Sequence, residues 1–349
     1  MKILVIFCTL FNIFNVSFAQ KDSIKLYYQN LNKAELAIVD SNYVNALKYY
    51  DTAFCFKKNP FGRDLYNATL TSIMIKSYPR ALAYLEKLFS LGFNLKTLDT
   101  INICKDFLAS SFGKVARKKH KELNVTYNRK YRSEIKKMLH NDQFFRVKEN
   151  GYERFGDTIR MIDRQNVEHL LKLITKYGFP SEDKIGIDPE NIMQPLFYVL
   201  VFHQNSGARY QTFNYSAILK TAILKGELRN NVGADLMQGA DGVRDYDAFG
   251  LVMAKFDTSV SEINDAGLSI KKVTSFQTNW GYFKIDDTEQ IKINQKRQLI
   301  FLEPLEQNLK KMAYSLKTNV FLFDCNAKSI FKYSTYKDFT HAKENIIYP

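Results

Sequence analysis

A repeat with a period of 35 residues is the feature that most constrains how this chain folds. Residues 43–50 and 78–85 align without a gap, and tyrosine, alanine, leucine and tyrosine recur at matching places. The small Ala46 and Ala81 allow two helices to approach closely, while the tyrosine that starts each segment fills the space at the turn. We therefore expect helical hairpins near the N-terminus.

The period and residue types resemble the tetratricopeptide repeat, a helical hairpin of about 34 residues. The expected hairpins pair residues 26–39 with 43–56, and 62–76 with 78–91. Gly92 then stands where a left-handed backbone ends a helix. Because stable stacks need about three units, the helical stretch at 98–117 is expected to pack on these two. The alternative is that two unrelated hairpins share this spacing by chance.

The first residues are typical of a cleavable secretory signal peptide. Lys2 gives a positive start, residues 3–16 are largely apolar, and Ser17 and Ala19 place small residues before the expected cleavage. The alternative is a membrane anchor, which needs roughly 18 to 20 apolar residues. This run is shorter and two asparagines interrupt it. We predict removal of residues 1–19, no later transmembrane segment, and a secreted or periplasmic location in the cell envelope.

Composition limits the partners that such a protein meets. Aromatic residues make up 14% of the chain, which is too many for a disordered polymer. Only 7 prolines and 15 glycines occur, which favours helices with short connections. The net charge of +14 becomes +13 when Lys2 is removed. Outside the cytoplasm this charge meets anionic glycans, lipid headgroups or wall polymers, so we expect no nucleic-acid partner.

Cysteine usage and motif content give no sign of a metal or cofactor. The mature chain holds Cys55, Cys104 and Cys325, without a CxxC motif. Three buried thiols, or one disulfide and a free thiol, both fit an oxidising compartment. The histidines show no ligand spacing, and neither an HExxH motif nor a glycine-rich phosphate loop occurs. We therefore expect no bound metal and no cofactor.

A basic segment at residues 114–137 follows the repeats and is expected to form a helical connector. It contains ten lysines and arginines against two glutamates, with two tyrosines interleaved. One interpretation is a surface for an anionic ligand or a membrane. The other is the solvated face of a long helix. The candidate binding residues are Arg117, Lys118, Lys119, Tyr127, Arg129 and Tyr131.

The central segment carries a dispersed pattern of polar residues and glycines. In order, these are Asp142-Gln143 with Arg146, Asp163 with Asn166, Tyr177-Gly178-Phe179-Pro180, His203-Gln204, and Ala222 with Gly226-Glu227. The pattern resembles the uncharacterised domain family DUF6624, whose usual Tyr-Gly-Thr-Gln stretch this chain lacks. Residues 293–297 and 302–305 resemble the tail that often follows that domain. The resemblance implies a secreted or envelope bacterial domain, sometimes behind tetratricopeptide-like helices, and it assigns no activity.

Four of these polar residues, Arg146, Asp163, His203 and Glu227, are the candidate catalytic residues. A histidine that a carboxylate positions can act as a general acid or base. Structural roles are the alternative for each residue. Asp163 is expected to cap a helix running to Tyr177, and His203 to stand at a helix C-terminus. Glu227 is expected to accept a salt bridge from Arg146.

We predict a mainly α-helical protein with little strand. Its expected parts are the signal peptide (1–19), the tetratricopeptide-like hairpins (20–113), the basic helical connector (114–137), the helical DUF6624-like domain (138–255) and a C-terminal extension that packs on that domain (256–349). In the extension, 287–299 and 305–316 are expected to be helices, 276–285 a loop or irregular edge, and residues 320–323 and 329–334 a minor β-hairpin.

The sequence favours an exported, non-enzymatic scaffold or interaction protein. Helical repeat arrays bind partners along their surfaces, so the expected ligand is a protein, a peptide or an anionic envelope component. The alternative is a cell-envelope hydrolase, or another enzyme, that uses the Arg/Asp/His/Glu cluster. Convergence of the four side chains in an open pocket would favour the enzyme.

Overall fold

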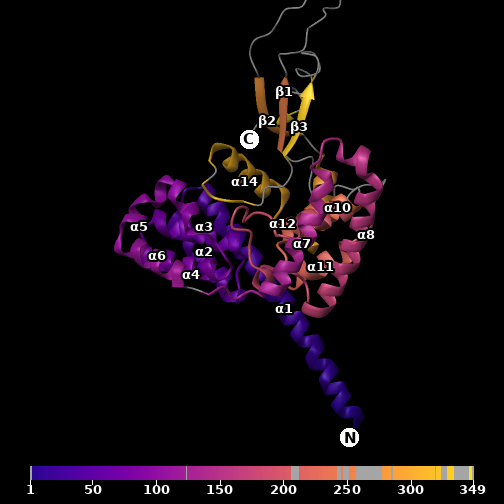
Figure 1. Ribbon diagram of the computed structural model, residues 1–349. Helices are drawn as coiled ribbons and strands as arrows, with labels where there is room; N and C mark the ends of the chain where they lie inside the picture. Colours follow the sequence, from indigo (N-terminus) through magenta and orange to yellow (C-terminus); the bar gives the residue numbers. More distant parts are fainter. Residues whose placement is uncertain are drawn as a thin grey trace, which may run out of the picture. The chain divides into compact units, whose positions relative to one another are not determined.

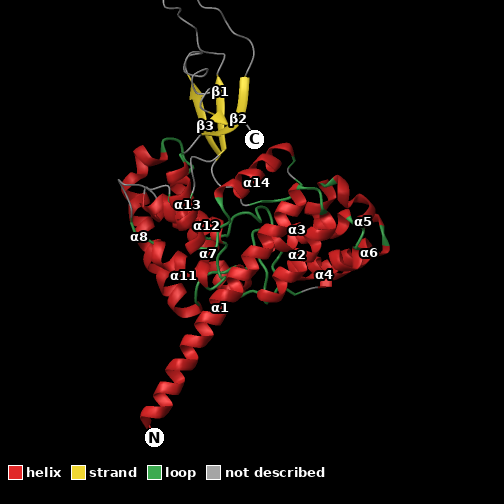
Figure 2. Cartoon of the chain, turned by 180° about the vertical axis from the view of Figure 1, so that it is seen from behind, coloured by secondary structure: helices red, strands yellow, loops and turns green. Residues whose placement is uncertain are grey.

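The computed structural model shows a mainly α-helical chain (Figure 1; Figure 2). The structure describes residues 2–122, 124–205, 212–241, 245–246, 251–256, 277–283, 286–318, 320–323, 328–333 and 346–347. Its contacts form two compact units. Unit 1 comprises Met1–Val243, Ile300–Leu302 and Thr318–Asp324, and unit 2 comprises Arg244–Leu299, Glu303–Lys317 and Cys325–Pro349.

Unit 1 begins with four helices, each of which packs against the next in the chain. They are α1 (Lys2–Val39), α2 (Tyr43–Phe56), α3 (Gly62–Met74) and α4 (Tyr78–Ser90). Ala46 and Ala81 are fully buried, as close helix packing requires. The backbone N–H of Asn45 donates to the Asn42 side chain, which caps α2. The predicted α-helices at these positions are confirmed to within two residues at every end except the start of α1.

α1 is longer than the sequence pattern indicates, because it starts at Lys2 rather than near Leu26. The helical backbone continues through the predicted cleavage position after Ala19. From Ile24 onward its buried face includes Tyr27, Tyr28 and Leu31. Among the helices that the structure describes, none has the length and apolar character needed to cross a membrane.

The helical stretch expected at 98–117 is divided into four elements. They are η1 (Leu95–Thr100), η2 (Asn102–Cys104), α5 (Lys105–Ala109) and α6 (Ser111–Glu122). Ser110 interrupts the helix with an extended backbone, and its hydroxyl accepts a bond from the N–H of Gly113. α6 lies against α4.

The rest of unit 1 is built around a long helical hairpin. Its helices are α7 (Arg129–Arg146), α8 (Gly151–Tyr177), α9 (Glu182–Ile185), α10 (Tyr198–Asn205), α11 (Ser216–Leu224) and α12 (Asn230–Asp241). α7 packs against α8, and α10 contacts both (Figure 1). α8 has a kink at Phe155 and ends at Gly178, where φ is +78°. The prediction that Asp163 caps a helix is wrong, because α8 starts twelve residues earlier and Asp163 lies inside it.

Unit 2 contains α13 (Asp287–Leu299), α14 (Leu305–Lys317) and one sheet. Its strands are β1 (Leu251–Phe256), β2 (Gln277–Phe283), β3 (Lys328–Tyr333) and β4 (Ile346–Ile347), in the order β3-β1-β2-β4. β1 pairs antiparallel with β2 and parallel with β3, and β4 pairs antiparallel with β2. The two helices match the prediction, whereas the region expected to be a loop forms β2.

The predicted C-terminal hairpin is wrong. One of its halves is β3, but β3 pairs with β1 from far earlier in the chain. The other half, residues 320–323, has no strand and belongs to unit 1. There, Leu322 exchanges two hydrogen bonds with the Asn67 side chain, at 2.7 and 2.9 Å. Leu322 therefore bonds to the Asn67 side chain rather than to a neighbouring strand.

Candidate functional site

Three of the four predicted catalytic residues meet where α7, α8 and α10 pack together. Arg146 donates to Asp142 Oδ1 at 2.9 Å, and to both carboxylate oxygens of Asp163 at 2.8 Å. His203 Nδ1 lies 2.8 Å from the other oxygen of Asp142. Asp142 was part of the family-like pattern but not of the predicted site. We call Asp142, Arg146, Asp163 and His203 the central polar cluster.

Helix geometry explains this convergence. Asp142 and Arg146 are four residues apart, so they share one face of α7. Asp163 faces them from α8, and α10 brings His203 in its last turn. The exposed fraction of the side chain is 0% for Asp142, 6% for Arg146 and 8% for Asp163. Burial raises the pKa of Asp163, and the bonds from Arg146 oppose this shift.

His203 is the most exposed member of the cluster, with 22% of its side chain accessible. Since an ionised carboxylate accepts hydrogen bonds only, Asp142 favours the ring form with its proton on Nδ1. Nε2 has no partner among the described residues. This arrangement is the one that orients a histidine for proton transfer at Nε2. It is equally an ion network that joins three helices.

Glu227, the fourth candidate, lies elsewhere. Its carboxylate pairs with Lys184 Nζ at 2.9 Å, not with Arg146 as expected. Glu227 lines a cavity of about 560 Å³ together with residues from α1 and from the end of α2, among them Lys57. Burial lowers the pKa of Lys57, whose ammonium group lies 4.4 Å from the centre of the Phe61 ring. Glu227 is therefore separate from the central polar cluster.

A cationic groove runs along α7 and the loop before it. Its volume is about 740 Å³, and it is lined by Val125, Tyr127, Arg129, Arg132, Ser133, Lys136, Lys137, His140 and Asn141. None of these lining residues is a carboxylate. Lys137 pairs with Glu134 at 3.1 Å, whereas Arg129 and Lys136 have no acidic partner among the described residues. An anion in this groove would meet uncompensated positive charge. We call these lining residues the α7 groove.

Local packing fixes the wall of the α7 groove. The Arg132 guanidinium lies 4.8 Å from the centre of the Tyr127 ring and donates to the Ile185 carbonyl at 2.6 Å. Gly186 lies against the Tyr127 ring. Its φ is +73°, and a Cβ at this position would lie 2.6 Å from the nearest atom of that ring. Only glycine fits both conditions. Asn128 caps α7 by accepting from the N–H of Tyr131 at 3.0 Å.

The other predicted binding residues are distributed differently. Tyr131 is fully buried, stacks on Tyr177 and donates to the Gly178 carbonyl, so its side chain belongs to the core. Arg117 donates to the Leu108 carbonyl at 2.8 Å, and Lys119 pairs with Glu86 at 2.7 Å. Lys118 is exposed, with Glu122 4.0 Å away. Of the six predicted residues, only Tyr127 and Arg129 line the α7 groove.

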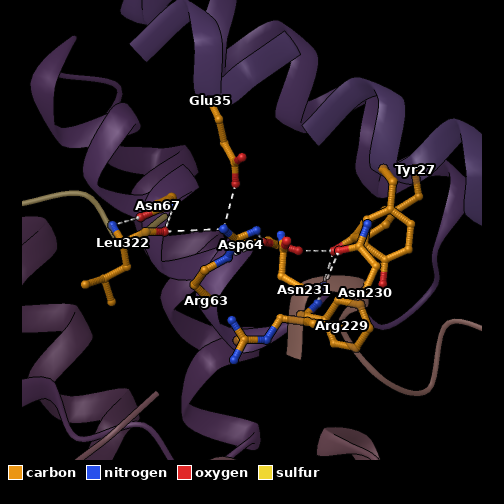
Figure 3. Close-up of polar contacts among 12 residues, drawn as sticks. Tyr27, Glu35, Arg63, Asp64, Asn67, Arg229, Asn230, Asn231 and Leu322 are labelled. Carbon is orange, nitrogen blue, oxygen red and sulfur yellow. Dashed lines mark hydrogen bonds and ion pairs between the residues drawn. The ribbon is translucent and has the colours of Figure 1, made fainter. Parts of the chain in front are cut away.

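Sequence patterns also missed a buried network on α3 (Figure 3). Arg63 Nη1 pairs with Glu35 at 2.7 Å, and Arg63 Nε donates to Asp64 at 2.8 Å. Tyr27 of α1 donates to the other oxygen of Asp64 at 2.5 Å. Nearby hydroxyls of Thr69, Thr71 and Ser72 donate to carbonyls one turn earlier. Because Glu35, Arg63, Asp64 and Tyr27 pair with one another inside the protein, we assign the network a structural role.

The described residues offer few other sites for chemistry. Among them, no group of three or more histidine, cysteine or acidic side chains could hold a metal ion. Cys55 is exposed and Cys104 buried, and both are free thiols, whereas Cys325 lies outside the described residues. Comparison of the chain with family models, with curated proteins and with solved structures finds no match.

Proposed function

We propose that this is an exported, non-enzymatic interaction protein that binds an anionic component of the cell envelope in the α7 groove. The observation that carries the proposal is the absence of carboxylates from the lining, where Arg129 and Lys136 are unpaired among the described residues. Two unpaired cations beside an aromatic ring form an environment that attracts phosphate or carboxylate groups. Binding of an anion in this groove would require no catalytic residue.

The sequence patterns support the same proposal. A signal peptide at 1–19 would deliver the basic chain to secreted or periplasmic surroundings, where anionic polymers are abundant. In this proposal α1 to α4 form tetratricopeptide-like hairpins, and the helices after them form a DUF6624-like domain. The hairpins would act as the rigid support, and α7 would carry the binding surface. A protein or peptide ligand would bind through its acidic side chains.

Titration with a soluble polyanion tests this function. Fluorescein-labelled poly-L-glutamate is added to the protein purified after export, and anisotropy is followed over a range of salt concentrations. We expect binding that weakens as salt rises, because the contacts are between charges. The double variant Arg129→Glu with Lys136→Glu should bind at least about tenfold more weakly.

A matched control carries Lys96→Glu and Lys105→Glu, which change two exposed lysines outside the groove. This variant has the same net charge as the groove variant. If both variants lose affinity equally, the attraction comes from total charge and the groove has no specific role. Absence of binding by the unmodified protein would also refute the proposal.

The central polar cluster supports a second candidate function, in which His203 transfers protons in an envelope hydrolase. The specific observation is the 2.8 Å contact that orients its ring, together with an unpartnered Nε2. One turn beyond Asp163, the buried Asn166 also has an amide nitrogen without a partner among the described residues. Burial closes this nitrogen to solvent, so the candidate function depends on His203 Nε2.

A panel of chromogenic ester, phosphoester and glycoside substrates tests this candidate. If an activity is found, His203→Gln should abolish it while far-UV circular dichroism stays unchanged. Glu227→Gln is the control, because Glu227 pairs with Lys184 away from the cluster. An activity that survives His203→Gln would exclude this histidine as the acid or base.

A further inference from the structure

The exposed face of α7 is longer than the groove and changes character along its length. Buried residues Tyr131, Ile135, Met138 and Asp142 mark the inner face, at the spacing of one helical stripe. The outer face carries Arg129, Lys130, Ser133, Lys136, Lys137, His140, Asn141 and Phe144, all of them exposed. At 1.5 Å per residue this face spans about 22 Å.

The far end of this face is apolar. Phe144 is 47% exposed and Val147, just after α7, is 75% exposed. Tyr152, at the start of α8, is 57% exposed. The Lys148 ammonium lies over the rings of Phe144, Phe145 and Phe155, at 4.3, 4.8 and 5.3 Å. Exposed aromatic and aliphatic groups beside a cation suit the boundary between lipid headgroups and acyl chains. We call Phe144, Val147 and Tyr152 the apolar tip, and Lys148 lies beside it.

Charge favours one occupant for the whole face. Arg129, Lys130, Lys136 and Lys137 lie on it, and Lys148 follows beside the apolar tip. None of the eight outer-face residues on α7 is acidic, and the one glutamate of α7, Glu134, is only partly exposed and pairs with Lys137 and His169. Beyond α7, the exposed Glu149 follows Lys148. An anionic bilayer would accept the cations at its headgroups and the apolar tip slightly deeper.

We propose that α7 docks this protein on a membrane surface rich in anionic lipid, with the apolar tip inserted among the headgroups. This inference rests on the proposed function, since the same cations would bind a soluble polyanion. It adds a role for the apolar tip, which would gain nothing from contact with a soluble polyanion. Docking at a surface requires only an exposed face and not a transmembrane helix.

Vesicle co-sedimentation tests the inference. The protein purified after export is mixed with vesicles of equal parts phosphatidylglycerol and phosphatidylcholine, and with vesicles of phosphatidylcholine alone. We expect binding to the first and little to the second. Loss of two attractive charges in Arg129→Glu with Lys136→Glu should weaken binding about thirtyfold or more. The variant Phe144→Ser with Val147→Ser should weaken it about tenfold, with poly-L-glutamate binding unchanged.

The single variant Val147→Ser separates the effect on binding from an effect on folding, because this side chain is three-quarters exposed. Its control is Val44→Ser on α2, where the valine is 54% exposed. We expect Val147→Ser to weaken vesicle binding and Val44→Ser to leave it intact. Equal binding by these two variants would overturn the inference. So would binding of poly-L-glutamate without binding to anionic vesicles, a result that leaves the proposed function standing and points to a soluble partner.

Discussion

Replacement of Arg146 by methionine should be among the most destabilising changes in unit 1. Arg146 is 6% exposed and donates to two carboxylates that are themselves buried. Methionine keeps an unbranched apolar stem but removes the guanidinium, which leaves Asp142 and Asp163 without their shared counter-charge. Breaking a buried ion pair on one side costs about 3 to 5 kcal/mol. We expect the free energy of unfolding to fall by this amount.

Urea unfolding followed by two signals measures the effect. Far-UV circular dichroism reports mainly on the helices, most of which are in unit 1. Fluorescence reports on unit 2, because the only tryptophan of the chain, Trp280, lies in β2. We expect Arg146→Met to shift the dichroism transition. The fluorescence transition is the internal reference.

The pH dependence gives a second measure of the same perturbation. Burial already raises the pKa of Asp163 with Arg146 present. Without Arg146 the pKa should rise further, since the bonds that oppose the shift are lost. An acid whose pKa is raised by folding destabilises the native state as pH rises through that pKa. The loss of stability in Arg146→Met, relative to the unmodified protein, should therefore shrink as the pH is lowered from neutral.

Arg160→Met is the matched control on the same hairpin. Arg160 is 44% exposed, and the carboxylate of its partner Asp157 is 98% exposed. A surface ion pair of this kind contributes at most about 1 kcal/mol. If Arg146→Met costs no more than Arg160→Met, the cluster does not hold the helices together and the electrostatic argument is refuted.

Two further predictions concern other parts of the chain. In unit 2, the charges of Lys311 and Arg297 outweigh burial and lower the pKa of Glu303 from 4.5 to about 2. Ionised Glu303 therefore stabilises the fold above about pH 4.5, and this contribution disappears as the pH falls towards 2. The variant Glu303→Gln should lower the free energy of unfolding by about 3 kcal/mol at neutral pH and by little at acid pH. Urea unfolding followed by fluorescence measures both values. In α4, Ala81→Leu should lower stability by about 1 to 3 kcal/mol because this position is fully buried. Exposed Ala83→Leu should have almost no effect, and equal thermal denaturation midpoints for the two leucine variants would contradict the packing argument.

Several elements followed from short-range patterns alone. α2, α4 and α13 begin where the sequence predicts, since capping residues and apolar periodicity act within a few residues of each helix. α8 shows the limit of such patterns. Asp163 is a good capping residue, yet the helix passes through it because its carboxylate bonds to Arg146 instead. Tertiary contact has overridden a local preference there.

The candidate site was predictable only in part. Residue types singled out Arg146, Asp163 and His203, but not the buried Asp142 that joins Arg146 to His203. Tyr131 is buried in the core, although the pattern of interleaved basic and aromatic residues assigned it to a binding surface. Its spacing from Ile135 and Met138 was the signal for a core position. The α7 groove required knowledge of which side of the helix faces solvent.

The sequence by itself determined the helical class, the close-packed alanines of the 35-residue repeat, and the end of α8 at Tyr177. These features depend on backbone preferences and side-chain volume, which are properties of neighbouring residues. Only the tertiary structure decided that residues 142 and 203 meet while Glu227 lies apart. It also decided that β3 pairs with β1. Such contacts depend on how whole helices and strands pack, which no short stretch of sequence specifies.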